Sequence, residues 1–370
     1  MIEKFLLTCA ISVTVLSVSA QNSFSGKTDK DNVSAVCNAV AAWQIANHAN
    51  SRHHQLDWTN GALYRGMVEW GKTSGNKNCI DFVMKIGKNH NWAMWRRPYH
   101  ADDICVGQAF IELYRMTGNK SMLQPVMERA YYVATHPSKA PLLKTDPIGK
   151  DERWSWCDAL FMAPPVYAAL YDITGDKTYA EYMDSEYRIC VDSLYDREEK
   201  LFYRDCKRIP LREANGSKQL WGRGNGWVFG GIPLILENLP QNHPTRFYYI
   251  ELFKEMAPSI LRTQDKNGAW HSSLLDPDSY PLPENSCSAF FCYGLAWGIR
   301  NGYLTDPAYR TALKKGWASL VAGVHSDGKL GYIQPVGAAP KAVGANATDV
   351  YGVGAFLLAG SELYRMDNAK

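Results

Sequence analysis

The sequence predicts an all-α protein whose helices pair into a closed ring, and three observations support this. Several segments share one plan: an amphipathic helix, a short glycine turn and a second helix that begins at a small polar residue. The two clearest copies lie 57 residues apart, counted from Gly118 to Gly175, which suits two helices with their loops. Six such units would fill about 340 residues, close to the chain length without its first twenty residues. A single (α/α)6 barrel is therefore expected over residues 21–370.

The turns define the individual hairpins. Residues 111–123 and 169–179 contain the clearest copies, and residues 74–78 and 301–309 contain looser ones. In each copy a glycine is expected to end the first helix in the left-handed conformation. An Asp, Ser or Thr can then cap the helix that follows.

The segments between the hairpins differ in composition from the helices. They are unusually rich in Trp, Arg, Asp, Gly and Pro, and they span residues 92–103, 150–165, 201–227 and 268–288. Loops on a rigid scaffold are where binding residues gather. In a toroid these loops converge at one mouth, where we expect the functional site.

The composition excludes some classes of partner. The net charge is +3, and no run of five or six like charges suggests a nucleic-acid arm or a membrane-binding face. Nucleic acid is therefore not an expected partner. The 12 Trp and 21 Tyr suit stacking on sugar rings, but buried aromatics are also ordinary core material, so composition leaves both interpretations open.

The first twenty residues are typical of a secretory signal peptide. Lys4 precedes an apolar stretch from Phe5 to Val18, and the segment ends with the small residues Ser19 and Ala20. This segment is too short for a transmembrane anchor, so we expect a periplasmic or secreted protein without membrane insertion. The remaining eight cysteines permit disulfides but show no metal-binding spacing, so most are expected to be buried thiols, without zinc or another cofactor.

Asp158 is the first candidate for chemistry. It stands at the start of an apolar helical run and is flanked by Trp154 and Trp156. An aspartate at a helix start is usually an N-cap. A carboxyl group beside indoles in an apolar pocket can instead stay protonated and act as a general acid. The sequence leaves both roles open.

A second acidic pair, Asp102 and Asp103, follows His100. One of the two is expected to cap a helix, and the other could face the mouth and assist Asp158, since glycosidic chemistry usually uses two carboxylates. His100 lies near these acids, but no nucleophile motif such as GxSxG accompanies it. A hydrolytic triad is therefore not expected.

The run from 220 to 227, LWGRGNGW, alternates glycines with larger residues. It lacks the setting of a nucleotide-binding motif. Arg223 offers a planar fork for a carboxylate, and Trp221 and Trp227 offer stacking surfaces. The alternative is a glycine-relaxed helix start with aromatic core packing.

Taken together, these segments resemble glycoside hydrolase family 105, the unsaturated rhamnogalacturonyl and glucuronyl hydrolases, with a more distant similarity to family 88. The matching blocks are ADDICVGQAFIELYRMTGN, DERWSWCDALFMAPPVYAALYDITGD, LWGRGNGWVFGGIP, ENSCSAFFCYGLAWGIRNGYL and DVYGVGAFLLAGSELYRM. They span nearly the whole chain after residue 20. The C-D-x-L-F-M-x-x-P and W-[AG]-R-x-N-G-W patterns are the specific ones.

The resemblance implies an (α/α)6 barrel without a metal, and it implies a role for several residues. Asp158 matches the catalytic acid, Arg223 and Trp227 match the substrate-binding pair, and Met162 is placed near the site. Asp102 or Asp103 matches the second acidic position. Arg204 departs from the pattern, because a histidine is expected after the aromatic pair that precedes it, and this puts the sugar specificity in doubt.

The implied reaction is hydration of the vinyl ether in a 4,5-unsaturated uronic acid at the non-reducing end of an oligosaccharide. Asp158 would donate a proton to C4 and then help water add to C5. Arg223 would hold the carboxylate, and Trp227 with Trp154 or Trp156 would cover the ring. A non-catalytic carbohydrate-binding toroid, or a lyase or ordinary glycosidase on this fold, remains an alternative. The sugar specificity and the oligomeric state stay open.

Overall fold

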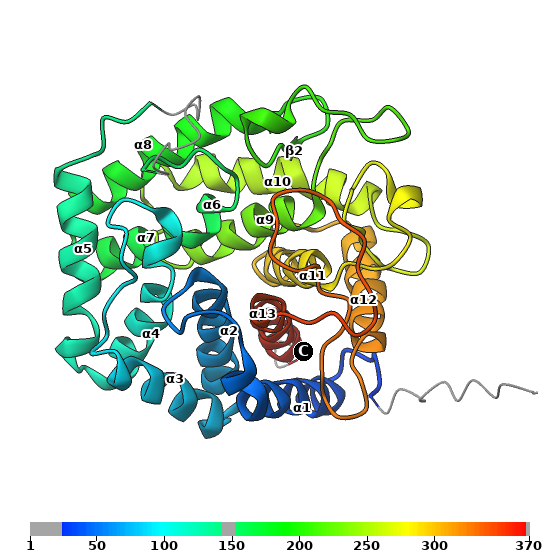
Figure 1. Cartoon of the computed structure of the whole chain (residues 1–370), viewed down its shortest axis with the longest axis horizontal. Coiled ribbons are helices and arrows are strands. Elements are labelled where there is room, and N and C mark those ends of the chain that lie inside the picture. Colours follow the sequence, from blue (N-terminus) through cyan, green and yellow to red (C-terminus); the bar gives the residue numbers. More distant parts are fainter. Residues whose placement is uncertain (1–23, 142–151, 368–370) are drawn as a thin grey trace, which may run out of the picture.

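The computed structural model describes residues 24–141 and 152–367, and it confirms the all-α prediction. The expected signal peptide lies outside these residues. Helices alternate along the chain between an outer and an inner ring (Figure 1). The outer helices are α1 (Lys30–Asn47), α3 (Lys77–Asn89), α5 (Gln124–Thr135), α8 (Lys177–Leu194), α10 (Arg246–Arg262) and α12 (Pro307–Ala322). The inner helices are α2 (Trp58–Ser74), α4 (Gly107–Thr117), α6 (Ala159–Met162) with α7 (Pro164–Thr174), α9 (Gly222–Leu236), α11 (Asn285–Arg300) and α13 (Val350–Asp367).

The inner ring is closed. Each inner helix contacts the next one along the ring, and α13 packs against α2, so the last helix of the chain meets the first inner one. This arrangement is the six-hairpin barrel that the sequence predicts. Because inner and outer helices alternate, the inner helices all run in one direction, and their amino ends meet at one face of the barrel.

The inner helix of the third hairpin is broken into α6 and α7. Pro164 and Pro165 follow Ala163, and a proline cannot donate a backbone hydrogen bond within a helix. The side-chain amide of Gln108 on α4 compensates by donating to the carbonyl oxygens of Phe161 at 2.7 Å and Met162 at 3.1 Å. These two carbonyl oxygens therefore have hydrogen-bond partners despite the break. The break also leaves Asp158 at the amino end of a short helix.

The turns between the helices follow the predicted glycine chemistry. Gly75, Gly118 and Gly175 end α2, α4 and α7 with φ of 78°, 69° and 70°. Polar side chains then accept hydrogen bonds from the backbone of the next helical segment, namely Asn76, Asn119, Asp176 and Asp306. The predicted hairpin boundaries are therefore confirmed, with asparagine sharing the capping role.

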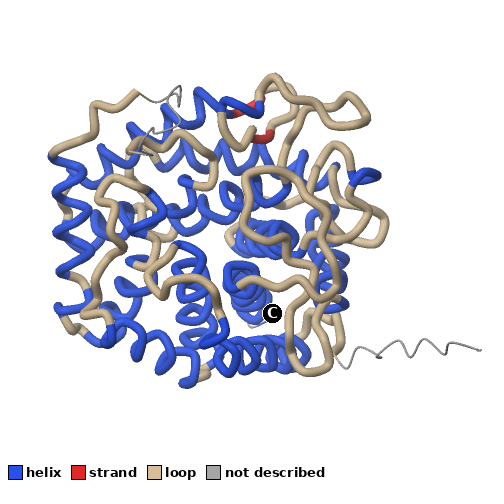
Figure 2. The backbone as a smooth tube through the Cα atoms, viewed as in Figure 1, coloured by secondary structure: helices blue, strands red, loops and turns tan. Residues whose placement is uncertain are grey.

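The remaining elements are short. A two-stranded antiparallel hairpin pairs β1 (Tyr195–Asp196) with β2 (Leu201–Phe202). The connections among the described residues contain five 3-10 helices, η1 (His48–Asn50), η2 (Ala101–Ile104), η3 (Lys120–Met122), η4 (Cys206–Arg208) and η5 (Pro277–Ser279). Figure 2 shows how much of one face of the barrel the long loops cross.

The core fills the space within and between the two rings. The inner helices are buried around most of their circumference, whereas an outer helix such as α3 buries one stripe, with Cys79, Val83 and Ile86. All eight cysteines after residue 20 are free, and seven of them are buried, as predicted. Among the described residues, no helix is long and apolar enough to cross a membrane.

Candidate active site

Asp158 lies at the amino end of α6, but it does not cap that helix. Its backbone is helical, with φ of −60° and ψ of −31°, and within the described residues its side chain accepts no capping hydrogen bond. The side chain is buried, and its Oδ2 lies 3.4 Å from Nε of Arg204. The capping role is thus unused, which leaves the carboxyl group available for chemistry.

Arg204 is brought to Asp158 by backbone pairing. The backbone N–H of Cys157 donates to the carbonyl oxygen of Arg204 at 2.8 Å, and Trp156 forms an antiparallel bridge with Asp205. Asn225 of α9 fixes the preceding strand, because its side chain both accepts from and donates to the backbone of Phe202, at 2.7 and 3.0 Å. The segment that carries Arg204 is therefore held at both ends.

Two carboxylates contact the Arg204 guanidinium, since Nη1 also donates to Oδ2 of Asp205 at 2.8 Å. Burial alone would lower the pKa of Arg204, but the charges of Asp158 and Asp205 raise it above its usual range. Arg204 is thus a permanent cation beside Asp158. A neighbouring cation favours the ionised form of a carboxyl group.

The structure gives Asp102 and Asp103 different surroundings. Asp103 is held by Arg97, whose backbone N–H, Nε and Nη2 all donate to it at 2.6 to 3.0 Å. Asp102 is also secluded, and its Oδ1 has no hydrogen-bond partner in the part of the chain that the structure describes. Burial raises the pKa of Asp102 to about 6; His100 and Arg97 oppose this rise, and Asp158 and Asp103 add to it. Asp102 is thus the member of the pair whose pKa the charge of Asp158 helps to raise.

His100 stands at the start of η2, where its Nδ1 accepts from the backbone N–H of Asp102 at 3.2 Å. The imidazole packs against the indole of Trp156 with centroids 4.9 Å apart. Trp154 packs instead in the core, against Tyr167 and Tyr182. Trp156 is thus the one of the two indoles that borders the acids.

Arg223, at the start of α9, is 1% exposed, and its guanidinium is engaged within the protein. Nη1 donates to the carbonyl oxygen of Gln334 and, at 2.8 Å, to the hydroxyl of Tyr351. Nη2 donates to the carbonyl oxygen of Pro335 at 3.1 Å. The fork predicted for a substrate carboxylate thus ties α9 to the loop before α13, and only Nε lacks a hydrogen bond among the described residues.

The other predicted residues around α9 and α6 are buried. Trp221 donates through Nε1 to Oε1 of Gln334 at 3.1 Å, and its ring lies under the Arg223 guanidinium. Trp227 packs against Phe161 and Phe290, and Met162 lies one helical turn beyond Asp158. A substrate would contact these side chains only from within a deep site.

The glycines between these residues serve helix packing. A Cβ at Gly222 would overlap the carbonyl oxygen of His271, and one at Gly226 would press on Cys287 and Phe290 of α11. A Cβ at Gly224 would lie 3.0 Å from the thiol of Cys157. The alternating glycines therefore let α9 approach α11 and the Asp158 segment, as the helix-start interpretation of this run predicts.

Polar atoms without partners gather in this region. Within residues 24–141 and 152–367, the buried atoms that lack a hydrogen bond include Oδ1 of Asp102, Nε of Arg204, Nε of Arg223 and Nε1 of Trp227. Buried polar groups in native proteins are almost always satisfied by protein, water or ligand. Hydrogen-bond donors and acceptors without partners at one face of the barrel indicate a site for a polar ligand.

Trp58 and Tyr351 were missed by the sequence analysis. Trp58 begins α2 and Tyr351 lies in the first turn of α13, and their rings stack with centroids 5.3 Å apart. Trp58 is partly exposed, unlike the four tryptophans predicted for the site. No local pattern could reveal this pair, because barrel closure alone brings residue 58 to residue 351.

Comparisons with known proteins identify related chains. Residues 36–367 match the model of Glycosyl Hydrolase Family 88. An unsaturated 3S-rhamnoglycuronyl hydrolase from Alteromonas sp. is 35% identical, covering 88% of this chain and 84% of that protein. The enzyme of the same description from Formosa agariphila is 37% identical and covers 88% of both chains. A solved structure described as a polysaccharide lyase superposes with a TM-score of 0.82 at 30% identity, over 92% of this chain and 99% of its own.

These relationships confirm the predicted resemblance to the unsaturated uronyl hydrolases and the predicted enzyme class. The family match covers nearly all of the described residues, and both curated relatives exceed 30% identity over most of their length. The chain therefore belongs to Glycosyl Hydrolase Family 88 and is a glycoside hydrolase that removes unsaturated uronic acid from oligosaccharides.

Proposed function

We propose that Asp158 and Asp102 act as one acid–base pair that hydrates the vinyl ether of a 4,5-unsaturated uronic acid, with Arg204 holding the carboxylate of the sugar. The observation that carries this proposal is the placement of Arg204, whose Nε lies 3.4 Å from Asp158 and has no hydrogen bond within the described part of the chain. Arg204 takes this role in place of Arg223, whose Nη atoms bond to the protein.

Below about pH 6, the free site holds a proton on Asp102. Two carboxyl groups that interact with each other share protons as a pair. Arg204 Nε lies 3.4 Å from Asp158 Oδ2, whereas burial raises the pKa of Asp102 to about 6. The proton passes from Asp102 to Asp158 after the substrate carboxylate has bound Arg204.

The reaction begins with proton transfer to the double bond and continues with the addition of water. Protonated Asp158 gives its proton to C4, the C4–C5 double bond becomes a single bond, and the ring oxygen stabilises the cation at C5. Water adds to C5 and returns a proton to the Asp158 carboxylate. The resulting hemiketal opens, and the rearranged sugar expels the remaining oligosaccharide as an alcohol. The spacing rule that separates retaining from inverting glycosidases does not govern this route.

The substrate class is an unsaturated uronic acid linked to a sulfated rhamnose. Both curated relatives carry the description 3S-rhamnoglycuronyl hydrolase. The Arg204 position supports the same class, since a permanent cation stands where a rhamnogalacturonyl enzyme is expected to have a titrating histidine.

The experiment is a comparison of two unsaturated disaccharides, one uronyl-rhamnose 3-sulfate and one rhamnogalacturonyl, on the wild type and Arg204→His. The ultraviolet absorbance of the conjugated enol ether reports turnover. We expect the ratio of kcat/KM between the two substrates to change by more than about tenfold, or 1.4 kcal/mol. An unchanged ratio would show that Arg204 does not contact the sugar.

A lyase is the second candidate, because one solved relative at 30% identity is described as a polysaccharide lyase. A lyase creates the conjugated enol ether from an intact polymer, whereas the hydrolase consumes it from an oligosaccharide. Incubation with an intact uronate polymer and with its lyase-generated fragments therefore separates the two. Rising absorbance with the polymer alone would favour the lyase.

Export completes the proposal. The Lys4 to Ala20 segment has the charge, apolar stretch and small-residue end of a signal peptide. The enzyme then acts on oligosaccharide fragments in the periplasm or outside the cell. Cell fractionation of the full chain, with a Leu6→Arg variant in the apolar stretch as control, tests this. Cytoplasmic retention of the wild type would contradict export.

A further inference from the structure

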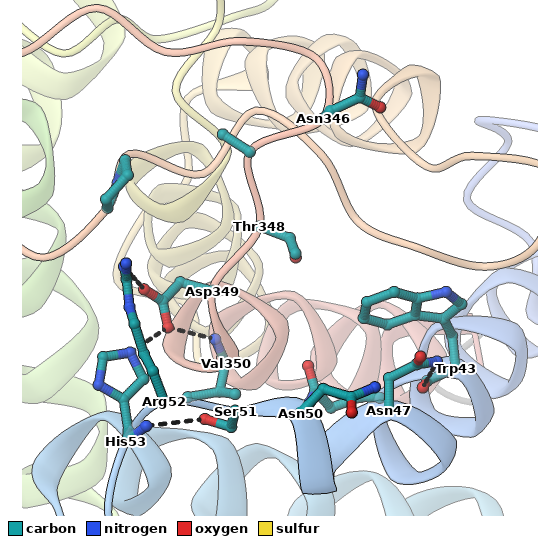
Figure 3. Close-up of a pocket in the computed structure, with 13 residues that line it drawn as sticks. Trp43, Asn47, Asn50, Ser51, Arg52, His53, Asn346, Thr348, Asp349 and Val350 are labelled. Carbon is teal, nitrogen blue, oxygen red and sulfur yellow. Dashed lines mark hydrogen bonds and ion pairs between the residues drawn. The ribbon is translucent and has the colours of Figure 1, made fainter.

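A pocket of about 490 Å³ lies beside the mouth of the barrel, between the end of α1 and the loop before α13 (Figure 3). This volume is typical of small-molecule sites. The indole of Trp43 stands on one side of the pocket, and Arg52, His53 and Asp349 stand on the other. Asparagine side chains line the space between them, from positions 47, 50 and 346.

The exposed charge in this pocket is positive. Asp349 is the single carboxylate among the lining residues, and its side chain is 4% exposed. It is satisfied by His53 Nε2 at 2.8 Å and by the backbone N–H of Val350 at 2.9 Å. Arg52 contacts it through one nitrogen at 3.4 Å and is 67% exposed. A guanidinium has five N–H donors, so Arg52 retains donors for an anion.

The pocket adjoins residues that bond to Arg223. Pro335 lines the pocket, and its carbonyl oxygen accepts from Arg223. Val350 also lines it, and the next residue, Tyr351, accepts from Arg223 and stacks on Trp58. The pocket thus lies beside Arg223 and Tyr351 at the mouth of the barrel.

We infer that this pocket binds the sulfate-bearing sugar that follows the scissile bond, with Arg52 on the sulfate and Trp43 against the ring. This inference rests on the proposed function, since it assigns the next sugar of the same substrate. The chemistry of the walls fits such a ligand: an indole for an apolar sugar face, amides for hydroxyl groups and a guanidinium for the anion.

The test uses two unsaturated disaccharides that differ only in the 3-sulfate of rhamnose, assayed with the wild type, Arg52→Gln and the control Arg197→Gln. Arg197 is also an exposed arginine, with 75% of its side chain exposed, at the start of the β1–β2 turn. The wild type should prefer the sulfated substrate, and Arg52→Gln should reduce this preference about tenfold. Arg197→Gln should retain it. Equal preference in the wild type and Arg52→Gln, with both substrates cleaved, overturns the inference.

Calorimetric titration with the methyl glycoside of rhamnose 3-sulfate separates the pocket from the reaction. Binding that Arg52→Gln weakens supports the pocket even if neither disaccharide is cleaved, in which case the proposed function alone fails. Absence of binding to the wild type overturns the inference whatever the activity. Inorganic sulfate is titrated in parallel. Equal affinity for sulfate alone would reduce the pocket to an anion site and overturn the assignment of a sugar.

Discussion

Asp158 and Asp102 share a site but differ in what surrounds them. Asp158 has a guanidinium beside it, whereas Asp102 has a buried oxygen without a hydrogen bond among the described residues. Pairs of carboxyl groups whose environments favour different protonation states are the usual means of acid–base catalysis near neutral pH. Burial thus distinguishes Asp102, and the contact with Arg204 distinguishes Asp158.

Asp158→Asn should fold normally and lose turnover. The side chain makes no capping hydrogen bond within the described structure, so an amide of the same shape disturbs little, but it cannot carry the acidic proton. We expect kcat to fall by about 10² to 10⁴ or more, with thermal unfolding unchanged. Asp172→Asn, an exposed aspartate paired with Arg115, is the matched control. Retained activity in Asp158→Asn would remove this residue from the mechanism.

The activity should depend on pH through Asp102. Its pKa is raised to about 6, so the pair holds the proton below this pH and loses it above. The free enzyme needs that proton, so kcat/KM should fall as the pH rises through about 6. Asp102→Asn cannot supply a proton, so this descending limb should disappear along with most of the activity. If the kcat/KM of Asp102→Asn still falls as the pH rises through about 6, a group other than Asp102 is responsible for the fall.

At the scale of the elements, α9 supports the site from one side. Its first turn carries Arg223, which reaches the loop before α13, and Asn225, which clamps the strand before Arg204. The glycines between them allow the close approach to α11 that this geometry needs. The helix is thus shaped by packing at its amino end.

Gly222→Ala should destabilise the protein through this packing. A Cβ at this position would overlap the carbonyl oxygen of His271, and backbone atoms do not move aside easily. Overpacking of this kind costs about 1 to 3 kcal/mol. Gly344→Ala is the control, because its Cβ would meet nothing within 4 Å, and it should change stability by less than about 0.5 kcal/mol. Urea unfolding of both variants measures the difference, and equal stabilities would refute the packing argument.

The local features of this fold could be predicted from sequence, and the contacts across the barrel could not. The turns at Gly118 and Gly175 depend on residues a few positions apart, so their chemistry is visible in the chain. The engagement of Arg223 by Gln334 and Tyr351 spans more than a hundred residues. A sequence shows that an arginine could bind a carboxylate, but it does not show which other acceptors the closed ring brings to it.

At the scale of the whole molecule, the two ends of the inner ring differ. The amino ends of the inner helices surround the site, where their dipoles favour an anionic substrate. The carboxyl ends carry buried ion pairs, in which Arg65 and Arg365 both contact Glu69, and so join α2 to α13. Burial alone would raise the pKa of Glu69, but these two guanidinium groups lower it well below its usual range.

Glu69→Gln should weaken the closure of the ring. The change removes the carboxylate that joins buried Arg65 to Arg365, which keeps its pair with Glu362, and breaking a buried ion pair costs about 3 to 5 kcal/mol. Because the pKa of Glu69 is lowered by folding, its contribution is present at neutral pH and is lost as the pH falls below the usual glutamate range. The difference in unfolding free energy between the wild type and Glu69→Gln should therefore be smaller at acidic pH than at neutral pH. Glu198→Gln, at an 80% exposed side chain, should cost less than about 1 kcal/mol, and an equal effect would contradict the account.

The central claim is that the enzyme protonates C4 of an unsaturated uronic acid from one fixed side. The most direct measurement is turnover in D₂O, with the released sugar analysed by NMR at early times. The account predicts one deuterium at C4 in a single configuration, because one carboxyl group of the Asp102–Asp158 pair delivers it. An ordinary glycosidase would release the intact unsaturated sugar, which rearranges in solution, so deuterium in both configurations at C4 would contradict the mechanism.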